Sequence, residues 1–132
     1  MKRITASSVQ YWLYAVLATK FGRQLSLERS SIARRYDVNR HDFSARQTFG
    51  GQGDRYAFAA SVAEYLSTYL AAAGFKRGEF GCVEKTFKDG EWEVEVRIYL
   101  QYKPQHSGFK NDTVELSVAA SRKKPAARRS VA

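Results

Sequence analysis

The predicted fold depends on how the segment "SIARRYDVNRHDF", residues 31–43, is interpreted. Its apolar pair, Ile32 and Ala33, is followed by a short polar break at residues 37–39, where one valine stands between an aspartate and an asparagine. Aspartate and asparagine favour turns because their short side chains hydrogen-bond to nearby backbone groups. Two interpretations stay open: a pair of helices docked at a fixed angle, or a plain helical hairpin with a basic outer face.

Apolar residues three or four positions apart, which share one face of a helix, predict four helices in the first 73 residues. Ser7 or Ser8 can cap the first helix, and Gly22 lies where that helix would stop. The four predicted helices cover residues 5–24, 25–36, 40–49 and 55–73. The last of these is the longest and has the broadest apolar stripe.

Beyond Gly74 the apolar period changes from a helical one to two, which is typical of half-buried strands. Residues 92–101 alternate strictly between apolar and polar side chains, with Tyr99 among the polar positions, and Asp89-Gly90 before them is a strong hairpin turn. The predicted strands cover residues 79–87, 92–102 and 113–120.

The expected fold class is therefore α+β, with N-terminal helices and a long helix packed on a three-stranded antiparallel sheet. We expect one domain over residues 1–120, with a helical part at 1–50 and a helix-plus-sheet part at 54–120. Residues 121–132 are expected to form a basic, flexible tail, because they are rich in arginine, lysine and small residues.

The formal net charge is +9, which is large for 132 residues. It is divided unevenly, with +6 over residues 1–50, −2 over residues 51–100 and +5 over residues 101–132. A basic excess attracts phosphate groups, so the charge predicts an anionic partner, most plausibly nucleic acid. The alternative is a basic protein whose charge has no specific partner.

Residues 27–49 resemble the helix-turn-helix motif of bacterial and phage repressors. The stretch "IARRYDVNRHDF" is similar to the pattern I-A-x-x-x-G-V-S-x-x-T-V, with Val38 as the inward turn residue and Phe43 as the anchor of the second helix. Asp37 and Asp42 stand where that family usually has glycine and threonine. The resemblance implies a second helix that enters the major groove of DNA.

The same resemblance assigns the candidate site residues. Those expected to face the bases are Arg40, His41 and Ser44. Those expected to contact phosphates are Arg34, Arg35, Asn39 and Arg46. The basic charge at the end of the chain adds the tail residues Lys123, Lys124, Arg128 and Arg129 to the expected phosphate contacts. The implied function is a small DNA-binding transcriptional regulator of a bacterium, phage or mobile element. A homodimer is expected, since one short helix rarely discriminates a site alone.

Two alternatives stay open. Residues 57–130 resemble a double-stranded-RNA-binding domain in the order of helix, three strands and a lysine-bearing final segment, which implies an RNA partner. The chain can also be a non-enzymatic interaction protein, such as a phage or mobile-element inhibitor of a host protein or nucleoprotein complex.

No pattern of catalytic or metal-ligating residues competes with these interpretations. A single cysteine, Cys82, excludes an internal disulfide and a thiolate zinc cluster, and two histidines are too few to replace it. No apolar run reaches the roughly 20 residues needed to span a bilayer. We therefore expect a cytoplasmic protein that is not an enzyme, has no cofactor or metal and does not enter a membrane.

Overall fold

The computed structural model describes residues 4–22, 26–37, 40–50, 55–103 and 113–123. The helical elements are α1 (Ala6–Phe21), α2 (Arg55–Ala72) and the 3-10 turn η2 (Glu79–Gly81). The strands are β1 (Ser26–Asp37), β2 (Arg40–Gly50), β3 (Lys76–Arg77), β4 (Val83–Asp89), β5 (Trp92–Lys103) and β6 (Thr113–Lys123).

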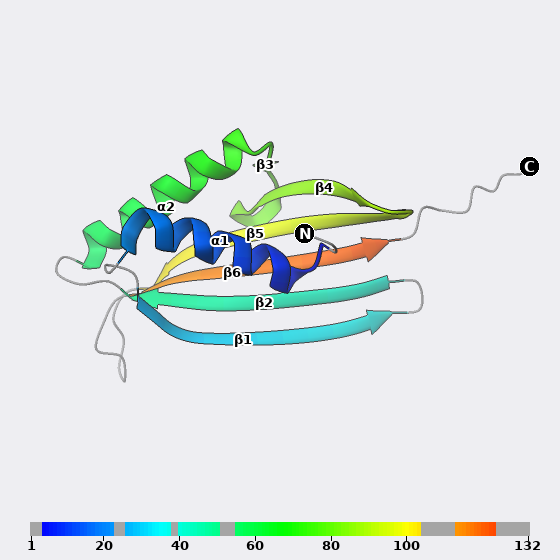
Figure 1. Ribbon diagram of the computed structural model, residues 1–132, viewed down its shortest axis with the longest axis horizontal. Coiled ribbons are helices and arrows are strands. Elements are labelled where there is room, and N and C mark those ends of the chain that lie inside the picture. The colour runs from blue at the N-terminus through cyan, green and yellow to red at the C-terminus, as the bar shows by residue number, and fades with distance from the viewer. Residues whose placement is uncertain (1–3, 23–25, 38–39, 51–54, 104–112, 124–132) are drawn as a thin grey trace, which may run out of the picture.

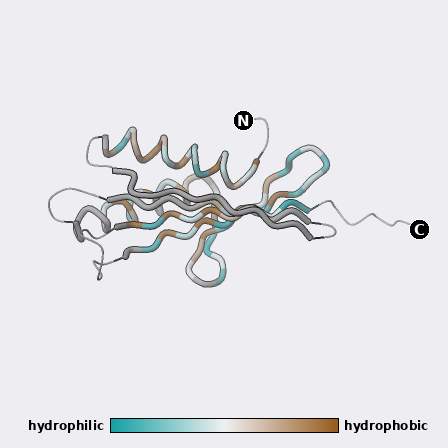
Figure 2. The backbone as a smooth tube through the Cα atoms, turned by 90° about the horizontal axis from the view of Figure 1, so that it is seen from below, coloured by the Kyte–Doolittle hydropathy of each residue, from teal (hydrophilic) through white to brown (hydrophobic). Residues whose placement is uncertain are grey.

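The strands form one antiparallel sheet in the order β1-β2-β6-β5-β4-β3, in which β3 contributes only two residues. Both helices run across the sheet in Figure 1. The view turned by 90° in Figure 2 shows α1 on one side of the strands. Elements from both ends of the chain lie side by side, because β2 pairs with β6 along the whole length of both strands.

The core lies between the helices and one face of the sheet, and it follows from the alternation of apolar residues. On β5, Val94, Val96 and Ile98 are buried, while Glu93 and Arg97 at alternate positions are exposed. Successive side chains of a strand point to opposite faces, so one face of β5 packs and the other meets water. The helices cover the packed face with Val9, Leu13, Leu17, Val62, Leu66 and Leu70.

The residues expected to form a helix-turn-helix are two adjacent strands instead, so the helices predicted over residues 25–36 and 40–49 are wrong. In β1 and β2, Asp37 pairs with Arg40 and the pairing runs back to Ser26 and Gly50. The physical reason is long-range. Since β2 lies between β1 and β6, strands on both sides satisfy its backbone hydrogen bonds, and this outweighs a weak local helical pattern. Val38 and Asn39 lie outside the described residues.

The expected three-stranded sheet is also wrong, since β1, β2 and β3 extend it. Several local predictions are confirmed: helices at the positions of α1 and α2, and the three strands β4, β5 and β6. The hairpin turn lies at Asp89-Gly90 as expected, with Gly90 at φ 66°. β6 continues to Lys123, past the expected start of the tail at residue 121.

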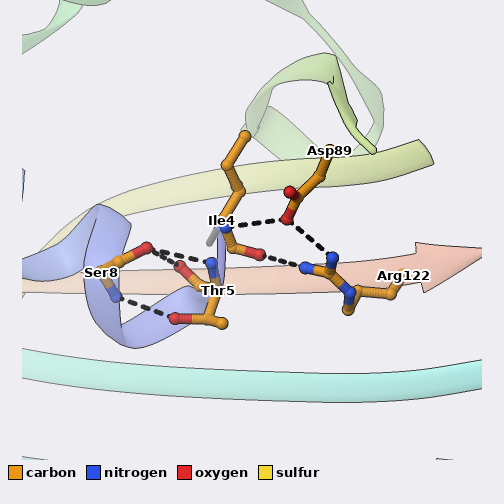
Figure 3. A network of polar contacts seen from close by, with 5 residues as sticks. All are labelled: Ile4, Thr5, Ser8, Asp89 and Arg122. Carbon is orange, nitrogen blue, oxygen red and sulfur yellow. Dashed lines mark hydrogen bonds and ion pairs between the residues drawn. The ribbon is translucent and has the colours of Figure 1, made fainter. Parts of the chain in front are cut away.

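A buried polar network joins the start of the chain to the end of β6 (Figure 3). Arg122 Nη2 lies 2.7 Å from Asp89 Oδ2, and its Nη1 donates to the carbonyl oxygen of Ile4 at 2.8 Å. The backbone N–H of Ile4 donates to the same Asp89 oxygen at 3.1 Å. The network therefore holds α1, the β4–β5 turn and β6 together at one end of the sheet.

Candidate nucleic-acid interface

The face of the sheet opposite the helices, which we call the open face, is lined by polar and small side chains. On β6, Ser117 and Ala119 of this face alternate with Leu116 and Val118 of the core. On β5, Tyr99 takes the open-face position opposite Ser117. Because no apolar stripe covers this face in the described residues, a partner that contacts it would meet mainly polar and small side chains.

Charges on the β4–β5 part of the open face neutralise one another. Arg97 lies 3.1 Å from Glu95 and 3.4 Å from Glu84, and Lys88 lies 3.6 Å from Glu93. The Glu95 carboxylate raises the pKa of Arg97, an effect that burial opposes and Glu84 reinforces. This part of the face therefore carries little charge to offer a partner.

The predicted residues of β2 divide between the two faces of the sheet. Residues an even number apart on a strand share a face, and Ser44 is exposed whereas Ala45 is buried. Arg40 and Arg46 are therefore placed on the open face with Ser44. His41 is placed on the helix-covered face with Ala45, so this residue does not join the others.

The neighbouring strands add two more predicted residues to the same face. Lys123 pairs with Arg40 across β6 and β2, and its side chain is exposed. Arg35 of β1 pairs with Asp42, two positions from Ser44, and so shares the open face. Arg34, one position along, is placed on the opposite face. The remaining predicted residues, Asn39, Lys124, Arg128 and Arg129, lie outside the described residues.

A hollow of about 310 Å³ lies on the open face where three strands meet. Small residues line it on β2 and β6, since Ser44 pairs with Ala119, and Ser117 is the small partner of the larger Tyr99 on β5. We call it the sheet hollow, and its open-face lining consists of Ser44, Ser117, Ala119, Tyr99, Gln101 and Glu115.

The sheet hollow contains groups that sequence reasoning did not select. Glu115 is 6% exposed and pairs in register with Gln101, so a carboxylate and an amide stand side by side. Burial raises the pKa of Tyr99, and the neighbouring buried Cys82 raises it further. The alternation along β5 does place Tyr99 and Gln101 on the wet face, but their nearness to Glu115 depends on a pairing between distant segments.

No family model, curated protein or solved structure matches this chain. In the part of the chain that the structure describes, neither α-helix is both long and apolar enough to cross a bilayer. Among the same described residues, no three His, Cys, Asp or Glu side chains are grouped as ligands of a metal ion.

Proposed function

We propose that this protein binds nucleic acid across the open face of its sheet. The proposal rests on the strand register, by which Arg35, Arg40, Arg46 and Lys123, from three strands, share the one face that the helices leave uncovered. On the same face Asp42 pairs with Arg35 and Asp37 pairs with Arg40, so these two arginines are partly neutralised. The net charge of +9 supports the same partner, because neutralising phosphates releases counterions and drives binding.

Single-stranded nucleic acid suits this face better than double-stranded nucleic acid does. Insertion of residues 39–48 into a major groove needed a helix, and residues 40–48 belong to β2 instead. A free two-stranded ribbon can also enter a groove, but β2 is paired with β6 over its whole length. A broad, polar sheet face with an aromatic ring matches the general requirements for single strands, which are cations for phosphates and a ring for bases.

The predictions of a transcriptional regulator and of a homodimer came from the helix-turn-helix resemblance and lose that support. The resemblance to a double-stranded-RNA-binding domain keeps its order of α2, β4, β5 and β6. However, β1 and β2 extend the sheet beyond β6, which that resemblance does not include. Both single-stranded DNA and single-stranded RNA present the phosphates and bases that the open face could contact, so the experiment compares them.

The test is fluorescence anisotropy with labelled single-stranded DNA, single-stranded RNA and duplex DNA over a range of salt concentrations. The double variant Arg40→Ala/Lys123→Ala should bind single strands more weakly and reduce the slope of log K against log salt by about 1.4, since each lost phosphate contact removes about 0.7. Lys76→Ala/Arg77→Ala is the matched control, because it removes two positive charges at β3, the opposite edge of the sheet.

Binding that weakens equally in the two double variants would mean that the charge acts without regard to position, which contradicts the proposal. Absence of binding to every strand at low salt also removes it. A duplex that binds more tightly than either single strand would show that the open face is not used as proposed.

A protein partner is a second candidate, favoured by a row of aromatic rings between the helices. The rings of Trp12 and Tyr69 are 5.7 Å apart between centroids, and those of Tyr65 and Tyr69 are 6.3 Å apart. Tyr11, which precedes Trp12 in the chain, is 70% exposed, and tyrosine and tryptophan are enriched at protein interfaces. Tyr11→Ala should leave strand binding unchanged. If it weakens strand binding as much as the Arg40/Lys123 variant does, the helical layer is the binding surface.

A further inference from the structure

We propose that a second hollow, on the helix-covered side of the sheet, binds a small carboxylic acid whose apolar part is a single aromatic ring. This hollow has a volume of about 260 Å³ and lies between α1, the residues just after α2, and β4. We call it the helix-side hollow. It is separate from the open face, so this inference does not depend on the proposed function.

The walls of the helix-side hollow are almost entirely apolar and come from three separate elements. Its lining includes Val9, Trp12, Ala73, Phe75, Lys85 and Phe87. The rings of Phe75 and Phe87 have centroids 6.0 Å apart and planes inclined at 60°. Aromatic rings favour such tilted and edge-to-face contacts over flat stacking. A ring that enters the hollow can therefore make the same kind of contact with the rings already there.

The size of the helix-side hollow fits one ring that carries a short side chain. An apolar cavity of about 150 Å³ is large enough to hold benzene. The helix-side hollow is larger, at about 260 Å³, and so leaves room for a few atoms beyond the ring. A ligand that fills this space has its ring among the apolar side chains and its other end beside the one charged group of the lining, the ammonium of Lys85.

Lys85 determines the charge that the ligand should carry. This residue is half-buried, and its ammonium contacts uncharged groups: Nζ donates to the Ala73 carbonyl oxygen at 2.7 Å and lies 5.0 Å and 6.0 Å from the ring centroids of Phe87 and Phe75. No carboxylate of the described residues forms an ion pair with it. An ammonium has three donors, of which the carbonyl uses one. A carboxylate can accept from another and supply the opposite charge, whereas a cationic ligand would be repelled.

The experiment titrates the nitrogen-15-labelled protein with phenylpropanoate, its neutral analogue phenylpropanamide and acetate, and follows the binding by NMR. Phenylpropanoate should shift the indole N–H resonance of Trp12 and the backbone N–H resonance of Ala73. The backbone resonances of Ser117 and Ala119, on the open face, should not move. The acid should bind about tenfold more tightly than the amide, because hydrogen bonds to charged groups are stronger than those between neutral groups. Acetate, which has no ring, should not bind measurably.

The variant that tests the charge is Lys85→Met, which keeps an apolar side chain of similar length in the hollow. It should lower the affinity for phenylpropanoate to that for phenylpropanamide and leave the affinity for the amide unchanged. Lys88→Met is the matched control, since it removes the same charge from the same strand at a side chain that is 77% exposed. This control should keep the tenfold difference between acid and amide.

A second variant keeps the test decisive if Lys85→Met destabilises the fold. Ala73→Leu fills the hollow while the backbone carbonyl at this position can still accept from Lys85, and it should abolish binding of both the acid and the amide. Ala72→Leu makes the same change one position earlier, where the side chain is exposed and does not line the hollow. It should leave both affinities unchanged.

Three results would overturn the inference. Equal affinities for the acid and the amide in the unmodified protein would show that Lys85 does not select a carboxylate. Acetate that binds as tightly as phenylpropanoate would mean that surface cations bind any carboxylate without a contribution from the hollow. Unchanged binding in Ala73→Leu would place the ligand elsewhere on the protein. None of these results affects the binding of nucleic acid, which is measured with separate variants.

Discussion

Arg122 and Asp89 form an ion pair in which the guanidinium is almost completely buried. The side chains are 4% and 17% exposed, and 2.7 Å separates Nη2 from Oδ2. The guanidinium also lies 5.7 Å from the ring centroid of Trp92. The buried Arg122 charge is tolerated because Asp89 and the carbonyl oxygen of Ile4 bind it. These contacts therefore hold β6 against the β4–β5 turn and against the residues before α1.

Asp89→Ala should lower the free energy of unfolding by about 3 kcal/mol, because it leaves the buried Arg122 charge without its carboxylate. Urea unfolding followed by circular dichroism measures the change. Lys88→Ala is the control, since the Lys88 and Glu93 side chains are 77% and 48% exposed and such pairs contribute less than about 1 kcal/mol. Equal losses in the two variants would mean that Arg122 finds other partners when Asp89 is absent.

The start of α1 provides a second prediction, because its cap differs from the two serines expected from the sequence. The Thr5 hydroxyl accepts from the Ser8 N–H at 3.1 Å, and the Ser8 hydroxyl accepts from the Thr5 N–H at 3.0 Å. This reciprocal capping box satisfies two backbone donors. Thr5→Ala should cost about 1 kcal/mol in urea unfolding. Ser7→Ala, at an exposed position, should change stability by less than about 0.5 kcal/mol; a larger loss there would contradict the assigned cap.

The sequence allowed the β4–β5 hairpin to be predicted because its signals are local. Asp89-Gly90 is a turn pair, and the strict alternation of residues 92–101 after it fits a strand with one wet face. The helices were predictable for the same reason: Leu13 and Leu17 are four positions apart, the spacing of one helical turn. The structure buries both of them. Such patterns need no knowledge of what packs against them.

The β1–β2 hairpin was not predicted because the interactions that favour strands there involve residues far away in the sequence. Phe43, Ala45 and Phe49 do follow a period of two, but Ile32, Ala33 and Val38 also fit helices joined by a turn. The pairing of β2 with β6 decides between the patterns, and it joins residues about 70 positions apart. The sheet hollow depends on the same pairing, so its composition could not be derived from local sequence either.

Lys85 provides a third prediction, since it lies on the core face of β4, where it pairs in register with the buried Val96. Its Nζ donates to the carbonyl oxygen of Ala73 at 2.7 Å and lies 5.0 Å from the ring centroid of Phe87. It therefore satisfies a backbone acceptor just beyond the end of α2. Lys85→Met should lower stability by about 1–2 kcal/mol in urea unfolding, because it keeps the length but removes the donor and the charge.

The exposed Lys88 is the control for that substitution, and Lys88→Met should change stability by less than about 0.5 kcal/mol. An unchanged stability in Lys85→Met would show that the Ala73 carbonyl is satisfied equally well by water.

Alkaline pH provides the last prediction, through the phenol of Tyr99. Burial, and then the proximity of Cys82, raise the pKa of this phenol above its ordinary value of 10.0 in the folded protein. The folded state thus keeps the proton at pH values where the unfolded state has lost it. This contribution to stability is complete below about pH 10 and is lost as pH rises through the folded pKa. Urea unfolding at pH values from about 9 to about 11 should show a steeper loss for the unmodified protein than for Tyr99→Phe, which has no proton to release. Equal slopes would mean that the environment of Tyr99 does not favour the neutral phenol.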